Sequence, residues 1–392
     1  MKIIYVDNNA TTKTAPEVVE TMLPYFSERY GNASSMHSFG GGLIVDIRRA
    51  RAQVADLIGA QPDEILFTSG GTESDATAIH AALQSNPGKR HIVTSRVEHP
   101  AIKNLYEQYG KNGYRITVVP VDCDGRLDEA ALIASLSDDT AIVSIMWANN
   151  ETGVISPIDA LSQEIRARGI VFHTDAVQAV GKIPIDLSRT GVDLLSMSAH
   201  KFHGPKGIGA LYIRKGTKFK PMLVGGHQEG GRRAGTENVP GIIGMGKACQ
   251  LAGEHLGDMG TRVRKLRDRL ENTLLQNVPR SMANGGPAER LPNTSSIAFE
   301  YVEGEAILLM MNEHGICASS GSACTSGSLE PSHVLRAMGV PFTAAHGSIR
   351  YSLSHYSTAE EVDYIVAHMP PIIERLRNMS PFWKQAAEAT TG

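Results

Sequence analysis

The sequence contains little cysteine, few aromatic residues and no excess of charge. It has four cysteines in 392 residues, and aromatic side chains make up 6% of the chain. So few cysteines, irregularly spaced, exclude the disulfide scaffold of a small secreted protein and favour a reducing compartment. The 38 Lys and Arg against 41 Asp and Glu give a formal net charge of -3. This balance offers no broad attraction to nucleic acid or to an anionic membrane, so we expect neither as a partner.

Long hydrophobic runs are missing as well. No stretch approaches the roughly 18 to 20 apolar residues of a membrane span. The chain begins MKIIYVDNNATT, which lacks the longer apolar core and the small-residue cleavage site of a signal peptide. We therefore expect a soluble, cytoplasmic protein.

Short β-type runs alternate with helical patterns from about residue 50 to 215. This alternation is typical of a mostly parallel sheet covered by helices, and it predicts an α/β fold. Several of the runs are continuously apolar, as expected for strands that are buried on both faces. The seven predicted strands are residues 65–68, 91–94, 115–119, 141–146, 169–173, 194–197 and 209–213.

The pattern changes after this region. A helix is predicted around residues 240–256, and a charged amphipathic helix, whose charged face we interpret as solvent-exposed, from about residue 259. Strands are predicted near 295–300 and 348–353, and Ser357 to Glu360 fits the capping box of a closing helix. We expect a large domain of residues 15–257 and a smaller α+β domain formed by residues 1–14 and 258–392.

One glycine-rich turn follows the first predicted strand. Gly70, Gly71 and Thr72 stand where the strand ends and a helical pattern begins. Glycines there let backbone N–H groups approach an anion at the positive end of the helix, which predicts a phosphate site. The turn is neither a Walker loop nor a dinucleotide-binding turn. Taken alone, an ordinary strand-to-helix turn explains it equally well.

Two further strands end in reactive side chains. Asp175 follows one apolar strand, where ligands sit in open α/β sheets, although helix capping is an alternative. Lys201 follows another, where an amine can be desolvated as Schiff-base lysines require, whereas we interpret Lys206 as solvated. An anion site, a carboxylate and an amine in this order meet the requirements of pyridoxal phosphate. His99 adds an imidazole able to stack on the pyridine ring, although a lone histidine is more often structural.

The cysteines divide into two groups. Cys324 lies in a Ser- and Gly-rich stretch, a composition that favours a mobile, exposed loop. Such a loop suits a nucleophile that collects a group in one place and delivers it in another. Cys123, Cys249 and Cys317 are interpreted as structural. The spacing of Cys317 and Cys324, with no matching second pair, is not a zinc-binding spacing, and we expect no resident metal.

These motifs, with others along the chain, closely resemble those of the pyridoxal-phosphate-dependent cysteine desulfurases of fold type I. The resemblance is nearest to the nitrogen-fixation-associated (NifS-type) branch and extends over nearly the whole chain. The matching segments are residues 5–12, 31–37, 69–74, 98–100, 149–153, 174–178, 198–201, 233–238 and 320–324.

The resemblance implies a role for each site residue. Lys201 bonds the cofactor aldehyde, Asp175 pairs with the pyridine nitrogen, and His99 stacks on the ring and takes part in catalysis. Thr236 reaches the phosphate of the partner subunit, so a homodimer is expected. The remaining implied contacts are Gln178 and Asn150 with the ring oxygen and nearby groups, Gly71, Thr72, Ser198 and His200 with the phosphate, and Arg350, beside Asn150, with the substrate carboxylate.

The function implied is the conversion of L-cysteine to L-alanine, with the sulfur passing to Cys324 as a persulfide. A scaffold or another acceptor protein would then receive the sulfur for the assembly of iron–sulfur clusters, those related to nitrogenase. Cys324 would contact such a cluster only transiently. The alternatives are a selenocysteine lyase or a cysteine sulfinate-active relative, and a catalytically idle sulfur-relay or scaffold-binding protein. An NAD-linked oxidoreductase is the weakest reading, because the glycines at 204–209 lack the strand–turn–helix context.

Overall fold

The structure, a computed structural model, describes residues 3–321, 331–381 and 383. Seven strands form one sheet in the order β2–β8–β7–β6–β5–β3–β4. Strand β8 is antiparallel to both of its neighbours, and every other pair is parallel. The predicted α/β class with a mostly parallel sheet is confirmed. The strands are β2 (Ile65–Thr68), β3 (His91–Ser95), β4 (Arg115–Val119), β5 (Thr140–Ser144), β6 (Val171–Asp175), β7 (Leu194–Ser198) and β8 (Gly209–Ile213).

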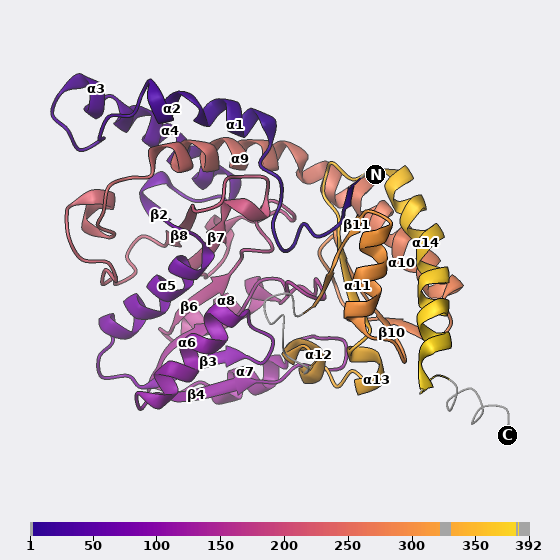
Figure 1. Cartoon of the computed structure of the whole chain (residues 1–392). Coiled ribbons are helices and arrows are strands. Elements are labelled where there is room, and N and C mark those ends of the chain that lie inside the picture. The colour runs from indigo at the N-terminus through magenta and orange to yellow at the C-terminus, as the bar shows by residue number, and fades with distance from the viewer. Residues whose placement is uncertain (1–2, 322–330, 382, 384–392) are drawn as a thin grey trace.

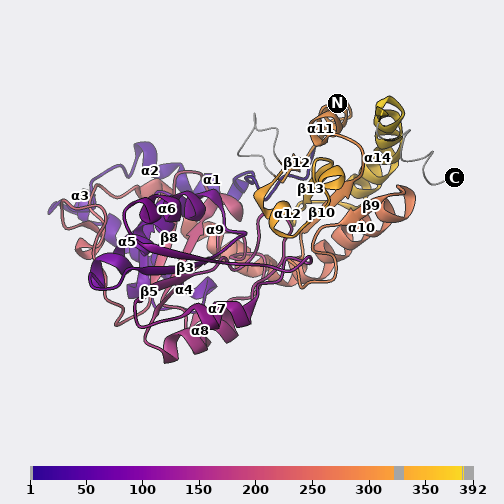
Figure 2. The same cartoon turned by 90° about the horizontal axis from the view of Figure 1, so that it is seen from below.

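Helices cover both faces of this sheet, with α5 and α6 on one side and α7 and α8 on the other (Figure 2). Every residue of β2, β3, β5, β7 and β8 is buried, which explains the continuous apolar runs in strands such as β2 and β8. The helices of this body are α1 (Pro16–Met22), α2 (Pro24–Ser27), α3 (Ser38–Gly41), α4 (Leu43–Leu57), α5 (Gly71–Ser85), α6 (Pro100–Lys111), α7 (Glu129–Ser135), α8 (Ile158–Ala167) and α9 (Val239–Asp258), with short 3-10 turns η1 (Pro62–Glu64), η2 (Leu187–Arg189), η3 (Ala199–Lys201) and η4 (Gln228–Gly231).

A smaller body lies beside the first, and the amino-terminal strand β1 belongs to it (Figure 1). It holds a four-stranded antiparallel sheet in the order β12–β13–β10–β9, and β1 pairs in parallel with β11. The strands predicted near 295–300 and 348–353 are therefore confirmed. The elements are β1 (Ile4–Tyr5), β9 (Ser281–Ala283), β10 (Thr294–Phe299), β11 (Ile316–Cys317), β12 (Ser319–Ser320), β13 (Ser348–Ser352), α10 (Arg264–Asn277), α11 (Gly304–Glu313), α12 (His333–Ala337), α13 (Phe342–Ala345) and α14 (Ala359–Met379).

Each body contains one of the two largest hydrophobic clusters. The two bodies share a helix, because α9 continues through a π-helical turn, η5 (Met259–Val263), directly into α10. The helices predicted around 240–256 and from 259 are thus one continuous helical segment. The division into domains of residues 15–257 and of 1–14 with 258–392 remains a proposal. Within the described part of the chain, no helix is both long enough and apolar enough to cross a membrane.

Some boundaries differ from the prediction. Strand β5 ends at Ser144 and not at residue 146, because the Met146 N–H donates to the Glu98 side chain. Strand β6 begins at Val171 and not at 169, because Gly169 has a φ of 66° in the turn that follows α8. Strand β6 also ends two residues later than predicted, so Asp175 is its last residue.

Three side-chain predictions are wrong in part: the position of the α14 capping box, the exposure of Arg267 and the structural role of Cys123. The capping box of α14 is formed by Thr358 and Glu361, one residue later than predicted. On the charged face after residue 259, Arg267 is buried and donates from Nη1 to the carbonyls of Leu291 and Thr294, both at 3.0 Å.

Among the cysteines interpreted as structural, Cys249 is buried and Cys317 half-buried, but Cys123 is exposed. Burial raises the pKa of the Cys249 thiol far above its usual range.

Candidate active site

The ends of several strands open on one cavity of about 640 Å³. The cavity lies where parallel strands present their carboxyl ends, the usual ligand position in an open α/β sheet. Ten of the predicted site residues line it: Gly71, Thr72, His99, Asn150, Asp175, Gln178, Ser198, His200, Lys201 and Arg350. Thr236 does not line it but lies exposed just before α9. Cys324 lies outside the described residues.

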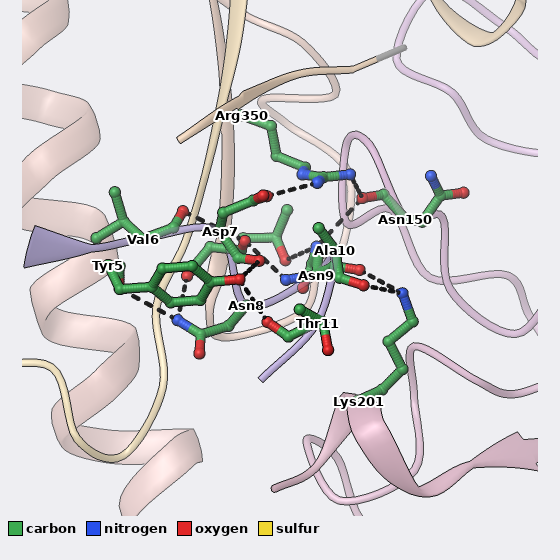
Figure 3. A network of polar contacts seen from close by, with 12 residues as sticks. Tyr5, Val6, Asp7, Asn8, Asn9, Ala10, Thr11, Asn150, Lys201 and Arg350 are labelled. Carbon is green, nitrogen blue, oxygen red and sulfur yellow. Dashed lines mark hydrogen bonds and ion pairs between the residues drawn. The ribbon is translucent and has the colours of Figure 1, made fainter. Parts of the chain in front are cut away.

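Lys201 is the last residue of the short turn η3, which follows β7 directly. Its Nζ donates to the backbone carbonyls of Asn9, at 2.7 Å, and Ala10, at 2.8 Å (Figure 3). The amino-terminal segment, far away in the sequence, therefore forms part of the wall against the reactive amine.

Asp175 ends β6 and is buried. Its Oδ1 accepts a hydrogen bond of 2.9 Å from the Val177 N–H. Burial raises the pKa of this carboxyl, and the positive charges that His99 and Lys201 can carry oppose the rise. A carboxylate in such a place is stabilised by a cation brought against it.

His99 is the N-cap residue of α6, and its Nδ1 accepts a hydrogen bond of 3.2 Å from the Ala101 N–H. In the neutral ring the proton therefore resides on Nε2. Burial lowers the pKa of His99, the nearby Lys201 ammonium lowers it further, and Asp175 opposes both. The residue thus supplies a neutral imidazole with an N–H donor.

The amino-terminal end of α5 has the form of an anion site. The helix begins at Gly71, where an added Cβ would come within 2.8 Å of Val177 Cγ2. The backbone can therefore lie this close to its surroundings only because residue 71 is glycine. Thr72, Ser198 and His200 line the cavity beside it. Burial lowers the pKa of His200 to about 4, so that its imidazole is neutral near pH 7.

Arg350 reaches the cavity from β13 of the smaller body and is buried. Its Nη1 donates to the Asn150 carbonyl at 3.0 Å and its Nη2 to Asp7 Oδ1 at 2.8 Å (Figure 3). Its Nε is buried without a hydrogen-bond partner among the residues that the structure describes. One edge of the guanidinium is therefore left for a ligand from the cavity.

Comparison with known proteins identifies the family of this chain. The aminotransferase class-V family model matches residues 4–365. The chain belongs to this family. A cysteine desulfurase of Trichormus azollae is 57% identical over all of this chain and 99% of its own, and the cysteine desulfurase NifS of Azotobacter vinelandii is 54% identical over 98% of this chain and 96% of its own. The predicted resemblance to the cysteine desulfurases is confirmed.

Solved structures agree with this assignment. A NifS-like protein has a TM-score of 0.89 at 38% identity and covers 96% of this chain and 100% of its own. A structure described as SspA in complex with cysteine has a TM-score of 0.79 at 33% identity, covering 90% of this chain and 99% of its own. The predicted fold type I architecture is therefore confirmed as well.

Class-V aminotransferases and cysteine desulfurases depend on pyridoxal phosphate, and the residues of this site fit that cofactor. An amine, Lys201, and a buried carboxyl, Asp175, open on the same cavity as the glycine-lined end of α5. These groups match the aldehyde, the ring nitrogen and the phosphate of the cofactor in turn. The set of groups, and not any one of them, makes the fit specific.

The sequence did not reveal a set of buried carboxyls around the cavity. Burial raises the pKa of Glu98 to about 8 and that of Glu151 to about 7, and it raises the pKa of Asp75, in α5, well above its usual value. Glu98 and Glu151 lie inside motifs that carried the resemblance, but nothing in the residue pattern indicates that they are buried. Their surroundings come from segments distant in sequence, such as Ser332, whose Oγ is 2.5 Å from Glu151 Oε2.

The amino-terminal contacts were also missed. Asn9 accepts at its backbone carbonyl from both Lys201 and Gln178, and at its side-chain oxygen from Lys182. Lys182 is fully buried, and burial lowers the pKa of its amine well below the usual value, with Lys201 adding to the effect. The motif at residues 5–12 indicated that this segment contributes to function, but it did not show where the segment lies in the fold.

Proposed function

We propose that this chain is a pyridoxal-phosphate-dependent cysteine desulfurase that converts L-cysteine to L-alanine and passes the sulfur to Cys324 as a persulfide. The observation that carries the proposal is that an amine, a buried carboxyl and an arginine all meet at one cavity, and that the arginine Nε has no partner among the residues that the structure describes. An amino acid needs the arginine for its carboxylate, and the cofactor needs the other two groups.

The chain's own residues divide the work. When bound, pyridoxal phosphate withdraws electrons from the bonds at the substrate α-carbon. Asp175 would hold a positive charge at the ring nitrogen, and Lys201 Nζ would move the proton at the substrate α-carbon. His99 Nε2 would offer an N–H donor to the cofactor, and Arg350 would hold the α-carboxylate of the substrate as a bidentate pair. Gly71, Thr72, Ser198 and His200 would hold the phosphate, and Gln178 and Asn150 would contact the ring substituents.

The sulfur transfer balances without an external oxidant. The thiolate of Cys324 attacks the substrate sulfur, the substrate Cβ–S bond breaks, and an S–S bond forms. The carbon skeleton takes up protons and leaves as L-alanine, so that L-cysteine and a thiol give L-alanine and a persulfide. The assignment of this role to Cys324 rests on its sequence motif.

The proposal extends to partners. A homodimer is supported by exposed apolar side chains on the first helices, among them Leu23, Phe26 and Val45, and by the exposed position of Thr236, which would reach the partner's phosphate. The persulfide would transfer its sulfur to a scaffold protein for iron–sulfur clusters, or to another acceptor protein, in the cytoplasm. A role in nitrogen fixation is supported by the identity to NifS.

The test is a product assay on the holoenzyme with L-cysteine and a thiol reductant. We expect alanine formation to fall at least about a hundredfold in Cys324→Ala, because the proton transfers remain but the sulfur has no acceptor. Cys317→Ala is the matched control and is expected to keep the activity, because this half-buried thiol does not line the cavity. Full alanine production by Cys324→Ala would overturn the scheme. L-selenocysteine and cysteine sulfinate, assayed alongside, distinguish the two enzyme alternatives.

A further inference from the structure

The unusual feature of the site is how Arg350 is held before any substrate arrives. Its side chain is 3% exposed, and among the described residues its charge is balanced by one ion pair, with Asp7 at 2.8 Å. A buried guanidinium without a counter-charge is costly, so the partner is needed for Arg350 to remain inside. The second contact, from Nη1 to the Asn150 carbonyl, lies on the other side of the guanidinium from Asp7 (Figure 3).

The residue before Asp7, Val6, is hydrogen-bonded through its backbone to a strand on each side. The Val6 N–H donates to the Cys317 carbonyl at 2.9 Å, and the Ser352 N–H donates to the Val6 carbonyl at 2.7 Å. Asp7 also forms an isolated parallel bridge with Ser352, two residues beyond Arg350. The carboxylate of Asp7 is therefore held in register with the arginine that it contacts.

Two fixed contacts determine the plane of a guanidinium. The Asn150 carbonyl accepts a hydrogen bond from Nη1, and the Asp7 carboxylate accepts one from Nη2. Nε remains buried without a partner among the described residues. The edge formed by Nε and Nη2 is the one that binds a carboxylate with two parallel hydrogen bonds. Without Asp7, the arginine is free to turn toward Glu151, another carboxyl that lines the cavity.

We propose that Asp7 is a positioning residue for the α-carboxylate of the substrate: with the Asn150 carbonyl it fixes the Arg350 guanidinium so that its Nε edge faces the ligand. This inference rests on the proposed function, because it takes an amino acid as the ligand. Asp7 does not touch the substrate and acts only through Arg350. It therefore affects the binding of ligands that carry a carboxylate and leaves the proton transfers at Lys201 unchanged.

The experiment compares Asp7→Ala and Asp7→Asn with the wild-type holoenzyme. We measure KM and kcat for L-cysteine and, by calorimetry, the Kd for L-alanine and for cysteamine, an amine without a carboxylate. In Asp7→Ala we expect KM for L-cysteine and Kd for L-alanine to rise about tenfold or more, the loss typical of one charge-assisted hydrogen bond. We expect kcat and the Kd for cysteamine to stay within about twofold. Asp7→Asn keeps an acceptor oxygen and is expected to restore KM to within about threefold of wild type.

Tyr5→Phe is the matched control on the same segment. The Tyr5 hydroxyl donates to the backbone carbonyls of Asp7, at 3.2 Å, and Thr11, at 2.8 Å, so its loss loosens the segment and leaves the Asp7 carboxylate in place. Tyr5→Phe is expected to leave KM unchanged. An unchanged KM in Asp7→Ala, an equal loss of cysteamine binding, or the same defect in Tyr5→Phe would each overturn the inference. If the wild type forms no alanine from L-cysteine, the proposed function fails, whereas the Kd for L-alanine still tests Asp7.

Discussion

Glu98 gives a pH-dependent prediction that can be worked out from the structure. Its buried Oε1 accepts hydrogen bonds from Ser95 Oγ at 2.6 Å and from the Met146 N–H at 2.9 Å, while Oε2 has no partner among the described residues. Burial raises the pKa of this carboxyl to about 8, and the negative charge of Asp175 adds to the rise. Between pH 4.5 and 8 the folded protein therefore keeps a proton that the unfolded chain releases.

The direction of the change in stability with pH follows from the number of protons bound in each state. Because the folded state binds more protons, its free energy of unfolding falls as the pH rises through this window, by up to about 5 kcal/mol over the full range. Glu98→Gln removes the titration. Its buried amide group costs about 1 to 3 kcal/mol at every pH, so the diagnostic quantity is the change with pH and not the offset.

The assay is thermal unfolding of the holoenzyme at pH 5.5 and pH 8.5. Relative to wild type, Glu98→Gln should gain about 3 kcal/mol between the two pH values. For a chain of this size that corresponds to roughly 4 °C in Tm.

Glu271→Gln is the matched control. Burial alone would raise the pKa of Glu271, but hydrogen bonds from Arg290 at 2.6 and 2.7 Å outweigh it and lower the pKa. The stability from Glu271 is thus already present throughout this window, so its variant should lose stability equally at both pH values. A pH-independent difference for Glu98→Gln would refute the reasoning.

Two further predictions concern local geometry. Gly71→Ala places a Cβ within 2.8 Å of Val177 Cγ2, so the affinity for pyridoxal phosphate, measured by equilibrium dialysis, should fall about tenfold and recover in the double variant with Val177→Ala; no recovery would mean that another contact is responsible. Thr358→Ala removes the side-chain cap from the Glu361 N–H and should cost about 1 kcal/mol in chemical denaturation, without affecting kcat; an unchanged midpoint would show that the capping box contributes nothing to α14.

The large sheet was predictable because most of its strands are buried on both faces, and the apolar runs that result are visible in the sequence. The ends of the strands were less predictable. Met146 continues the apolar run, but its N–H donates to the side chain of Glu98, brought from another strand end, while Ile145 and Trp147 still donate to the carbonyls of His173 and Asp175 in β6. The capping box shows the same limit. Both Ser357 and Thr358 have a glutamate three residues later, but the Ser357 hydroxyl accepts from the Ser354 N–H, which leaves the cap to Thr358.

The site was predictable as far as it follows the order of strand ends. Lys201 and Asp175 could be located because each lies at or just beyond the carboxyl end of a strand, and the topology then brings them together. The groups that hold them in place could not be predicted. Asp7 meets Arg350 across 343 residues, and no spacing or periodicity encodes a contact of that range. Arg267 was misread for a related reason, since its backbone partners, Leu291 and Thr294, lie before and at the start of β10 and not on its own helix.

The pairing of the amino-terminal segment also has a consequence for synthesis on the ribosome. Asn8, one of the first residues to be made, hydrogen-bonds to the Ser352 carbonyl, 344 residues later in the chain. At about 5 to 20 residues per second, its partner is made roughly 20 to 70 seconds afterwards. The seven-stranded sheet ends at Ile213, so its strands are complete well before then. All strands of the large sheet are therefore synthesised before Arg350 and Ser352 exist, and the site gains its arginine only when about nine-tenths of the protein has been made.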